Sequence, residues 1–348
     1  MNPRFYFATC QAGAEKAVKA EVLAGLPSLR FSFSRPGFVT FKEAEGEGAP
    51  LALERAVFVR LWGEALGQAK DAAALAALVS GIPSGACVQA FDRDQYLPGE
   101  EPPGYAPGGR IAGLFSGLGL PPAGKLPRPG EAVYSLIWVD DFHVFLGRHV
   151  HSARLSGFPG NRVELQLPPE APSRAWLKLE EAIARFKPVV PQCAVALEVD
   201  CAPGGASTAL LDRGFTVTGV DPQHVDERVF RNPRFGLLRK QARFLDEEDL
   251  RKCNPDWLVM DMSIAPLEAL DELAHVIGLL RTIHGAALKL RHGFLTLKLN
   301  DRSFASSIPL YLKRVERLGF RDLRAMQLCA NRQEFFVWAP RFEVPGGK

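Results

Sequence analysis

Residues 195–208 read VALEVDCAPGGAST, and this stretch decides the fold class. Residues 195–200 are mostly apolar and predict a short strand; Gly204 and Gly205 follow within a few residues, and a helix is predicted after them. A strand that passes through glycines into a helix is typical of the first βα unit of a doubly wound α/β fold. Because glycine has no Cβ, such a turn also lets a bound molecule approach the backbone.

The next predicted strand, residues 215–220, ends at Asp221. Nucleotide-binding folds place a carboxylate at this point to bind ribose hydroxyls. The glycines follow neither the GxGxxG nor the P-loop pattern, which disfavours a pyrophosphate ligand. An ordinary tight turn followed by an exposed Asp is the alternative interpretation.

Short apolar runs alternate with helical patterns on both sides of this turn, which predicts a parallel sheet covered on both faces. The expected strands are 195–200, 215–220, 257–261, 293–298, 321–328 and 334–338, and the expected helices are 175–186, 206–212, 267–280 and 303–318.

The first 150 residues have a different, α+β pattern and predict a smaller separate domain. Its expected strands are 5–9, 29–34, 37–41, 86–91, 133–139 and 143–147, and its expected helices are 12–26 and 71–79. Residues 97–130 are rich in Pro and Gly and are interpreted as an insertion with one short helix at 110–118. Residues 151–171 are the expected linker to a second domain over 172–345.

Composition limits the classes of protein. The 348 residues are 47% hydrophobic and 23% charged, with a formal net charge of +3, which is typical of a folded protein and permits a polyanionic partner. No apolar run is long enough to span a bilayer and no signal peptide is recognised, so a cytoplasmic protein is expected. The six cysteines contain no CxxC pair, and His143, His149 and His151 lack regular ligand spacing, so no metal site is predicted.

The motif DxCAPGGxST, followed one βα unit later by Val220-Asp221-Pro222, resembles the S-adenosylmethionine site of the FtsJ-like ribose 2′-O-methyltransferases. That family carries a Lys-Asp-Lys-Glu tetrad. Its counterparts here are Lys178, Asp261, Lys298 and Glu334, in that order along the chain.

The whole chain is similar to the bacterial ribosomal RNA large subunit methyltransferase M family. The resemblance implies methylation of a cytidine ribose in 23S rRNA, free or in a large-subunit precursor, and an amino-terminal THUMP-type RNA-binding region. It implies cofactor contacts from Ala175, Ala202, Pro203, Gly204, Gly205, Asp221, Gln241 and Asp261. Ala175 and Ala206 depart from the usual Ser and Trp. Relatives carry an Asp that contacts adenine, and the residue nearest to that position in this chain is Gln241. The oligomeric state stays open, with a monomer as one reading.

The tetrad suits methyl transfer to a hydroxyl group. An amine can take the hydroxyl proton, but a lysine has an ordinary pKa of about 10.4, so burial or a neighbouring cation must lower the pKa of Lys298 before it can act as the base. Lys178 would stabilise the developing alkoxide, while Asp261 and Glu334 orient the lysines. Two surface ion pairs are the alternative interpretation of these four charges.

A basic and aromatic run, residues 228–244, is a candidate RNA-binding stripe, with a solvated basic face as the equal alternative. Two other functions stay open: methylation of tRNA or another RNA, and an inert RNA-binding or ribosome-assembly protein that kept the fold.

Overall fold

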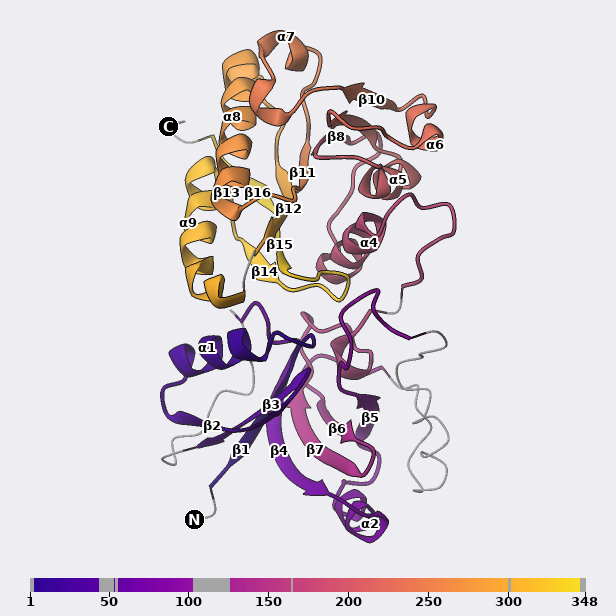
Figure 1. The fold of residues 1–348 in the computed structure, drawn as a ribbon, viewed down its shortest axis with the longest axis vertical. Helices are drawn as coiled ribbons and strands as arrows, with labels where there is room; N and C mark the ends of the chain where they lie inside the picture. Colours follow the sequence, from indigo (N-terminus) through magenta and orange to yellow (C-terminus); the bar gives the residue numbers. More distant parts are fainter. Residues whose placement is uncertain are drawn as a thin grey trace. The chain divides into compact units, whose positions relative to one another are not determined.

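A computed structural model describes residues 3–43, 53, 56–102, 126–163, 165–299 and 302–344 (Figure 1). The chain divides into two compact units, residues 1–163 and 164–348, and the division falls within the predicted linker 151–171. The helix expected at 110–118 lies outside the described residues.

In its described part, the amino-terminal unit is built on a seven-stranded sheet of order β2-β3-β1-β4-β7-β6-β5. The strands are β1 (Phe5–Thr9), β2 (Leu29–Arg35), β3 (Phe38–Glu43), β4 (Leu61–Ala69), β5 (Cys87–Asp92), β6 (Ala132–Asp140) and β7 (His143–Val150). Helix α1 (Glu15–Gly25) packs on β2 and β3, and α2 (Ala72–Ser80) packs on β4. All neighbouring strands are antiparallel except β5 and β6, which are parallel.

Strand β4 is absent from the sequence-based prediction, although it lies at the centre of the sheet. Its sequence, LWGEALGQA, contains two glycines and no regular alternation. Gly63 is required by packing, because a Cβ there would lie 2.8 Å from the ring of Phe7. Gly147 on β7 touches the same ring. Gly63, one of the two glycines that hide the strand in the sequence, thus admits a buried aromatic side chain.

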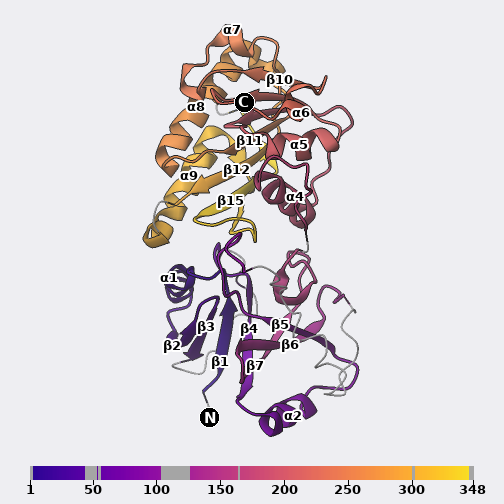
Figure 2. The same cartoon turned by 45° about the vertical axis from the view of Figure 1, so that its right-hand side comes forward.

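The carboxy-terminal unit contains a second seven-stranded sheet, of order β10-β9-β8-β11-β12-β15-β14. Its strands are β8 (Val195–Val199), β9 (Thr216–Val220), β10 (Phe235–Leu238), β11 (Trp257–Asp261), β12 (His292–Lys298), β14 (Arg324–Met326) and β15 (Glu334–Ala339). Helices α4 (Ala175–Phe186) and α5 (Gly205–Asp212) lie on one face, and α8 (Pro266–His284) and α9 (Ile308–Leu318) lie on the other (Figures 1 and 2). The predicted α/β, Rossmann-like class is confirmed.

The expectation of a wholly parallel sheet is wrong at one edge. Strands β10, β9, β8, β11 and β12 are parallel, but β15 runs antiparallel to both β12 and β14. The reason is the connection: α9 leads into a short hairpin, so the chain returns along β15 without a second crossover. The last residue of β12 therefore faces the first residue of β15.

Three smaller differences between the expected and observed elements concern a split strand, an additional strand and the start of a helix. The strand expected at 321–328 is split, with β13 (Phe320–Arg321) pairing with β16 (Arg341–Phe342) in a separate ribbon and β14 joining the main sheet. Strand β10, which is not among the expected strands, lies within residues 228–244, the candidate RNA-binding stripe. The helix expected at 303–318 begins as a 3₁₀ turn (Arg302–Ser307) and becomes α-helical only at Ile308, where Pro309 occupies an early position that needs no backbone donor. The short segments α6 (Glu227–Phe230) and α7 (Glu247–Leu250) complete the unit.

Candidate functional site

The predicted tetrad meets at one edge and on one face of the carboxy-terminal sheet. Asp261 pairs with Thr296 in the parallel ladder, and Lys298 lies two residues further along the same strand. Lys298 in turn pairs with Glu334 in the antiparallel ladder. Because side chains alternate between faces with a period of two, Asp261, Lys298 and Glu334 share one face. Helix α4, which carries Lys178, covers that face.

Lys178 is held by two carboxylates. Its Nζ lies 3.0 Å from Oδ2 of Asp261 and 2.8 Å from Oε1 of Glu334. Burial alone would lower the pKa of Lys178, but the charges of Asp261 and Glu334 outweigh it and raise the pKa above its usual value. Burial would likewise raise the pKa of Glu334, yet Lys178, with a smaller contribution from Lys298, lowers it. At neutral pH Lys178 is therefore an ammonium bound to the ionised carboxylate of Glu334.

Lys298 differs from Lys178 in its surroundings. It lies at the end of β12, half-buried, and directly opposite Glu334. Within the described residues its amine forms no ion pair, whereas the carboxylates of Asp261 and Glu334 bind Lys178. The two lysines of the tetrad are therefore unequal: one is fixed by two carboxylates and the other is not.

The turn after β8 requires glycine for two reasons, the backbone conformation at Gly204 and close packing at Gly205. Gly204 has a left-handed φ of 110°, and a Cβ on Gly205 would lie 2.2 Å from Oγ of Ser173, in the turn before α4. The peptide bond between Ala202 and Pro203 is cis, and the Pro203 carbonyl accepts the amide of Asp226. The glycine pair thus brings the start of α5 against the start of α4, which carries Ala175.

Carboxylates gather where β9, β8 and β11 end. Asp221 is buried and accepts hydrogen bonds from the amides of Ala202 (2.9 Å) and Gln223 (2.7 Å). Asp200, which sequence reasoning missed as a site residue, follows β8 with a left-handed φ of 63°. Burial, then the charges of Asp221 and Asp261, raise the pKa of Asp200 to about 6. The signal was available in the sequence, since Asp200 ends the same apolar run that leads into the glycines.

Glu198 is a second acidic residue that the sequence analysis left out. It is buried on β8, on the face covered by α5, where the hydroxyl of Ser207 donates to its Oε2 at 2.6 Å. Burial, with added repulsion from Asp261 and Asp221, raises the pKa of Glu198 to about 8. Glu198 is therefore mostly protonated at neutral pH and adds little to the negative charge of this edge.

We expect Glu198→Gln to stabilise the unit at alkaline pH. The pKa of Glu198 is higher in the folded than in the unfolded chain, so its contribution to stability is complete below about pH 4.3 and is lost as pH rises through about 8. The amide keeps the acceptor for Ser207 and cannot ionise. The free energy of unfolding at pH 8.5 should rise by about 1–3 kcal/mol, with no gain at pH 4. Urea unfolding at both pH values measures this, and an equal change at the two would contradict it.

Gln241 is placed near the carboxyl edge, three residues after β10 ends, but its contacts are local. It is exposed, and its Oε1 accepts from Nε of Arg243 at 2.9 Å. The structure thus brings Ala202, Pro203, Gly204, Gly205, Asp221 and Asp261 together at one edge, with Ala175 beside the glycines. It leaves Gln241 at the margin.

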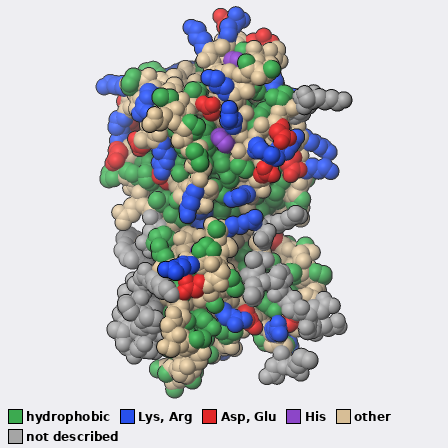
Figure 3. Space-filling view, turned by 180° about the vertical axis from the view of Figure 1, so that it is seen from behind, with side chains coloured by type: hydrophobic (Ala, Val, Ile, Leu, Met, Phe, Trp, Pro, Cys, Tyr) green, Lys and Arg blue, Asp and Glu red, His purple; other side chains and the backbone are tan. Residues whose placement is uncertain are grey.

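Most cations of the run 228–244 are already engaged. Arg228 pairs with Asp226, Arg231 with Glu227, and Lys240 with Asp249, while Arg234 donates to the carbonyl of Leu211. Figure 3 shows basic and acidic side chains interspersed over the face of residues 164–348 that it presents. The interpretation of this run as a phosphate-binding stripe is therefore weakened, because carboxylates close in space but outside the run offset its charge.

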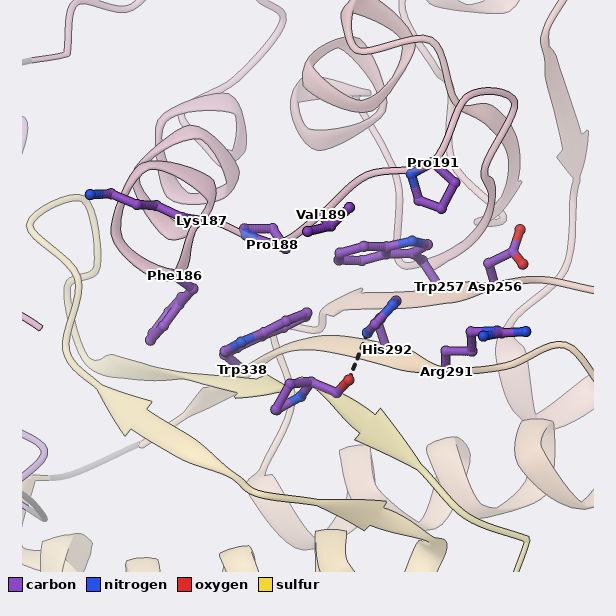
Figure 4. Close-up of a pocket in the computed structure, with 11 residues that line it drawn as sticks. Phe186, Lys187, Pro188, Val189, Pro191, Asp256, Trp257, Arg291, His292 and Trp338 are labelled. Atoms are coloured by element: carbon purple, nitrogen blue, oxygen red, sulfur yellow. Dashed lines mark hydrogen bonds between the residues drawn. The ribbon is translucent and has the colours of Figure 1, made fainter. Parts of the chain in front are cut away.

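A cavity of about 700 Å³ lies at the opposite edge of the sheet (Figure 4). Its lining includes His292, which opens β12, and Trp257, which opens β11, so it lies at the amino ends of the parallel strands. The side chains of Trp257 and Trp338 are only 0% and 4% exposed and stack on each other at 5.4 Å. His292 packs on both rings and is hydrogen bonded to the carbonyl of Pro340. These contacts belong to the core and not to the candidate site.

Within the described residues, no cluster of His, Cys, Asp and Glu has an arrangement that could hold a metal ion. Over the same part of the chain, no helix combines the length and the apolar character needed to cross a membrane.

Comparison with known proteins shows what the carboxy-terminal part is similar to. Residues 171–335 match the family described as FtsJ-like methyltransferase. The chain is 31% identical over 210 residues to ribosomal RNA large subunit methyltransferase M of Halorhodospira halophila, covering 59% of this chain and 57% of that protein. It is 27% identical over 217 residues to the protein of the same name from Pseudoalteromonas atlantica, covering 58% and 57%.

The chain thus spans somewhat more than half the length of the curated relatives it matches. Among solved structures, TrmN from Thermus thermophilus is similar at 16% identity over 97% of this chain and 99% of that chain, with a TM-score of 0.34, a likeness too weak to support an argument. The sequence matches confirm the resemblance carried by the glycine turn and the tetrad. Residues 171–335, somewhat less than half of this chain, are therefore similar to the FtsJ-like methyltransferases.

Proposed function

We propose that this protein transfers a methyl group from S-adenosylmethionine to the ribose 2′-hydroxyl of a cytidine in 23S rRNA. The observation that carries the proposal is the inequality of the two lysines. Lys178 is bound by Asp261 and Glu334, whereas Lys298 lies opposite Glu334 and forms no ion pair with any residue that the structure describes. An amine that acts as a base and an ammonium that stabilises an anion need these two different environments. The names of the relatives, which are ribosomal RNA methyltransferases, support the class of substrate.

The residues at the carboxyl edge fit the proposed cofactor. Burial raises the pKa of Asp200, and the charges of Asp221 and Asp261 raise it further, so negative charge is concentrated at this edge. S-adenosylmethionine has a sulfonium and an ammonium cation and a ribose diol, all of which carboxylates bind well. When bound, it supplies an electrophilic methyl group. The residues proposed to hold it are Ala175, Ala202, Pro203, Gly204, Gly205, Asp221, Gln241 and Asp261.

The four residues of the tetrad divide into three roles in the proposed reaction. Lys298 accepts the proton of the 2′-hydroxyl as the oxygen becomes nucleophilic. Lys178 keeps its proton, because its pKa is raised, and its ammonium stabilises the negative charge that develops on the oxygen. Asp261 and Glu334 hold Lys178 at 3.0 and 2.8 Å and so fix the direction of that charge.

The amino-terminal unit is proposed to hold the RNA, as a THUMP-type region, so that the target nucleotide reaches the tetrad. We infer a cytoplasmic site of action, on free 23S rRNA or on a precursor of the large subunit. The proposal needs no membrane and no metal ion.

Methyl transfer to isolated RNA tests the proposal. The purified full chain is incubated with S-adenosylmethionine labelled in its methyl group and 23S rRNA from cells that lack this protein. We expect stoichiometric labelling of one cytidine, which alkaline hydrolysis and mass spectrometry identify as 2′-O-methylated, and no labelling of 23S rRNA from cells that contain the protein.

Two other outcomes would overturn the proposal. Labelling of tRNA in place of 23S rRNA would assign the same chemistry to another RNA. Binding of S-adenosylmethionine without transfer to any RNA would indicate an inert RNA-binding or assembly protein.

A further inference from the structure

One face of α4 carries a polar stripe that extends beyond Lys178. Arg174, Lys178, Glu181 and Arg185 are four, three and four residues apart and therefore lie on one side of the helix. A helix that covers a sheet normally presents an apolar face to it. Here the stripe instead contacts residues 327–333, the connection that leads into β15 and Glu334.

Glu181 and Arg185 form a buried ion pair within this stripe. Nε of Arg185 lies 2.7 Å from Oε1 of Glu181, and both side chains are only 2% exposed. The second carboxylate oxygen of Glu181 accepts the amide of Ala330 at 3.2 Å, and Nη2 of Arg185 lies 3.5 Å from Sγ of Cys329. Arg174 donates to the carbonyl of Ala330 at 3.2 Å. Helix α4 and its N-cap residue Arg174 thus bind both backbone polar groups of Ala330.

The connection that α4 binds is itself held at several points. The amide of Leu328 donates to Oδ1 of Asn331 at 2.8 Å, and the backbone amide of Asn331 donates to the carbonyl of Leu328 at 3.1 Å. The carbonyl of Gln333 accepts the amide of Leu299, the residue after Lys298, at 2.6 Å. Only three residues separate Ala330 from Glu334. The contacts of α4 with Ala330 therefore also determine where α4, and with it Lys178, lies relative to Glu334.

We propose that Glu181 and Arg185 are positioning residues that hold Lys178 at the correct distance from Glu334. This inference rests on the proposed function, since the distance from Lys178 to Glu334 affects activity only if the tetrad catalyses the reaction. Stability alone gives a weak reason for the pair, because apolar side chains of similar volume commonly replace a buried ion pair at little or no cost. Directional hydrogen bonds to Ala330 fix the register of helix and strand in a way that apolar packing does not.

The double variant Glu181→Met/Arg185→Leu tests the proposal, because it removes both charges and leaves neither buried alone. We expect it to keep the thermal midpoint of the wild type within a few degrees while kcat for methyl transfer falls about 10- to 100-fold, the scale expected for a displacement of about 1 Å at a reacting group. The KM for S-adenosylmethionine should change less than about twofold, because Asp221 and the glycine turn are untouched.

The matched control is Glu180→Met/Arg213→Leu. Glu180 neighbours Glu181 on α4 and is also buried and ion-paired, but its partner Arg213 follows α5 and is far in sequence from residues 327–333. We expect its kcat to stay within about twofold of the wild type. Equal kcat in the two double variants, whether both lose activity or both keep it, would overturn the assignment.

A readout without RNA separates this inference from the proposed function. The charged groups that bind Lys178 are Asp261 on β11 and Glu334 on β15, and Lys298 on β12 lies opposite Glu334. In protein containing ¹³C-labelled lysine, NMR titration should show a lower pKa for Lys178 in Glu181→Met/Arg185→Leu, because Glu334 is no longer held beside it, and an unchanged pKa in the control. An unchanged pKa in both variants would refute the positioning role. An inactive wild type would refute only the proposed function.

Discussion

Lys298→Ala should lower kcat for methyl transfer about 10²- to 10⁴-fold, the usual contribution of a general base, while the affinity for S-adenosylmethionine stays within about twofold. Lys298 forms no ion pair within the described residues and is half-buried at the end of β12, so its removal leaves the Lys178 pairs in place. Single-turnover transfer to 23S rRNA measures the rate, and calorimetry measures binding of the cofactor.

Lys313→Ala is the control for this variant. Lys313 is exposed on α9, on the other face of the sheet, so the substitution removes the same charge from the same unit without touching the tetrad. We expect kcat within about twofold of the wild type. If Lys298→Ala kept a tenth or more of the wild-type rate, Lys298 would not be the base.

Lys178→Met should destabilise the carboxy-terminal unit by about 3 kcal/mol at pH 7.5, because removing one partner of a largely buried ion pair leaves the other charges uncompensated. Tryptophan fluorescence during urea unfolding reports the loss, since Trp176, Trp257 and Trp338 all lie in this unit. The double variant Lys178→Met/Glu334→Gln should recover part of it, because it also removes one of the stranded charges.

The pH dependence of this loss follows from the two shifted pKa values. The lowered pKa of Glu334 gives stability that is present above its unfolded pKa, about 4.3, and is lost as pH falls through the folded value. The raised pKa of Lys178 gives stability that is present below about pH 10.4 and is lost as pH rises through the folded value. The effect of Lys178→Met should therefore be largest between these limits and shrink near pH 3.5. The same loss at pH 3.5 and 7.5 would show that ion pairing is not its cause.

The sequence determined the local elements of the carboxy-terminal unit. The predicted helix 175–186 matches the bounds of α4, and the strands at 195–200, 215–220 and 257–261 match within a residue. Hydrophobic periodicity and glycines act over short distances along the chain, so they are readable without the fold. The same local signals failed at β4, where Gly63 makes room for the distant ring of Phe7, and at β10, which lies within a run of charges.

Order along the chain and family resemblance also supplied the four residues of the tetrad, but only the tertiary structure decided how they meet. Asp261 lies 83 residues from Lys178, and Glu334 opens a strand, which would place it at the wrong edge of a parallel sheet. The antiparallel direction of β15 brings Glu334 opposite Lys298.

Tertiary structure likewise decided that Lys178 is the paired lysine, that Lys240 is offset by Asp249 outside its run, and that Arg174 and Glu181 hold Ala330. The physical reason is common to all three. Electrostatic contacts depend on distances between side chains that the fold brings together, and neither composition nor periodicity contains those distances.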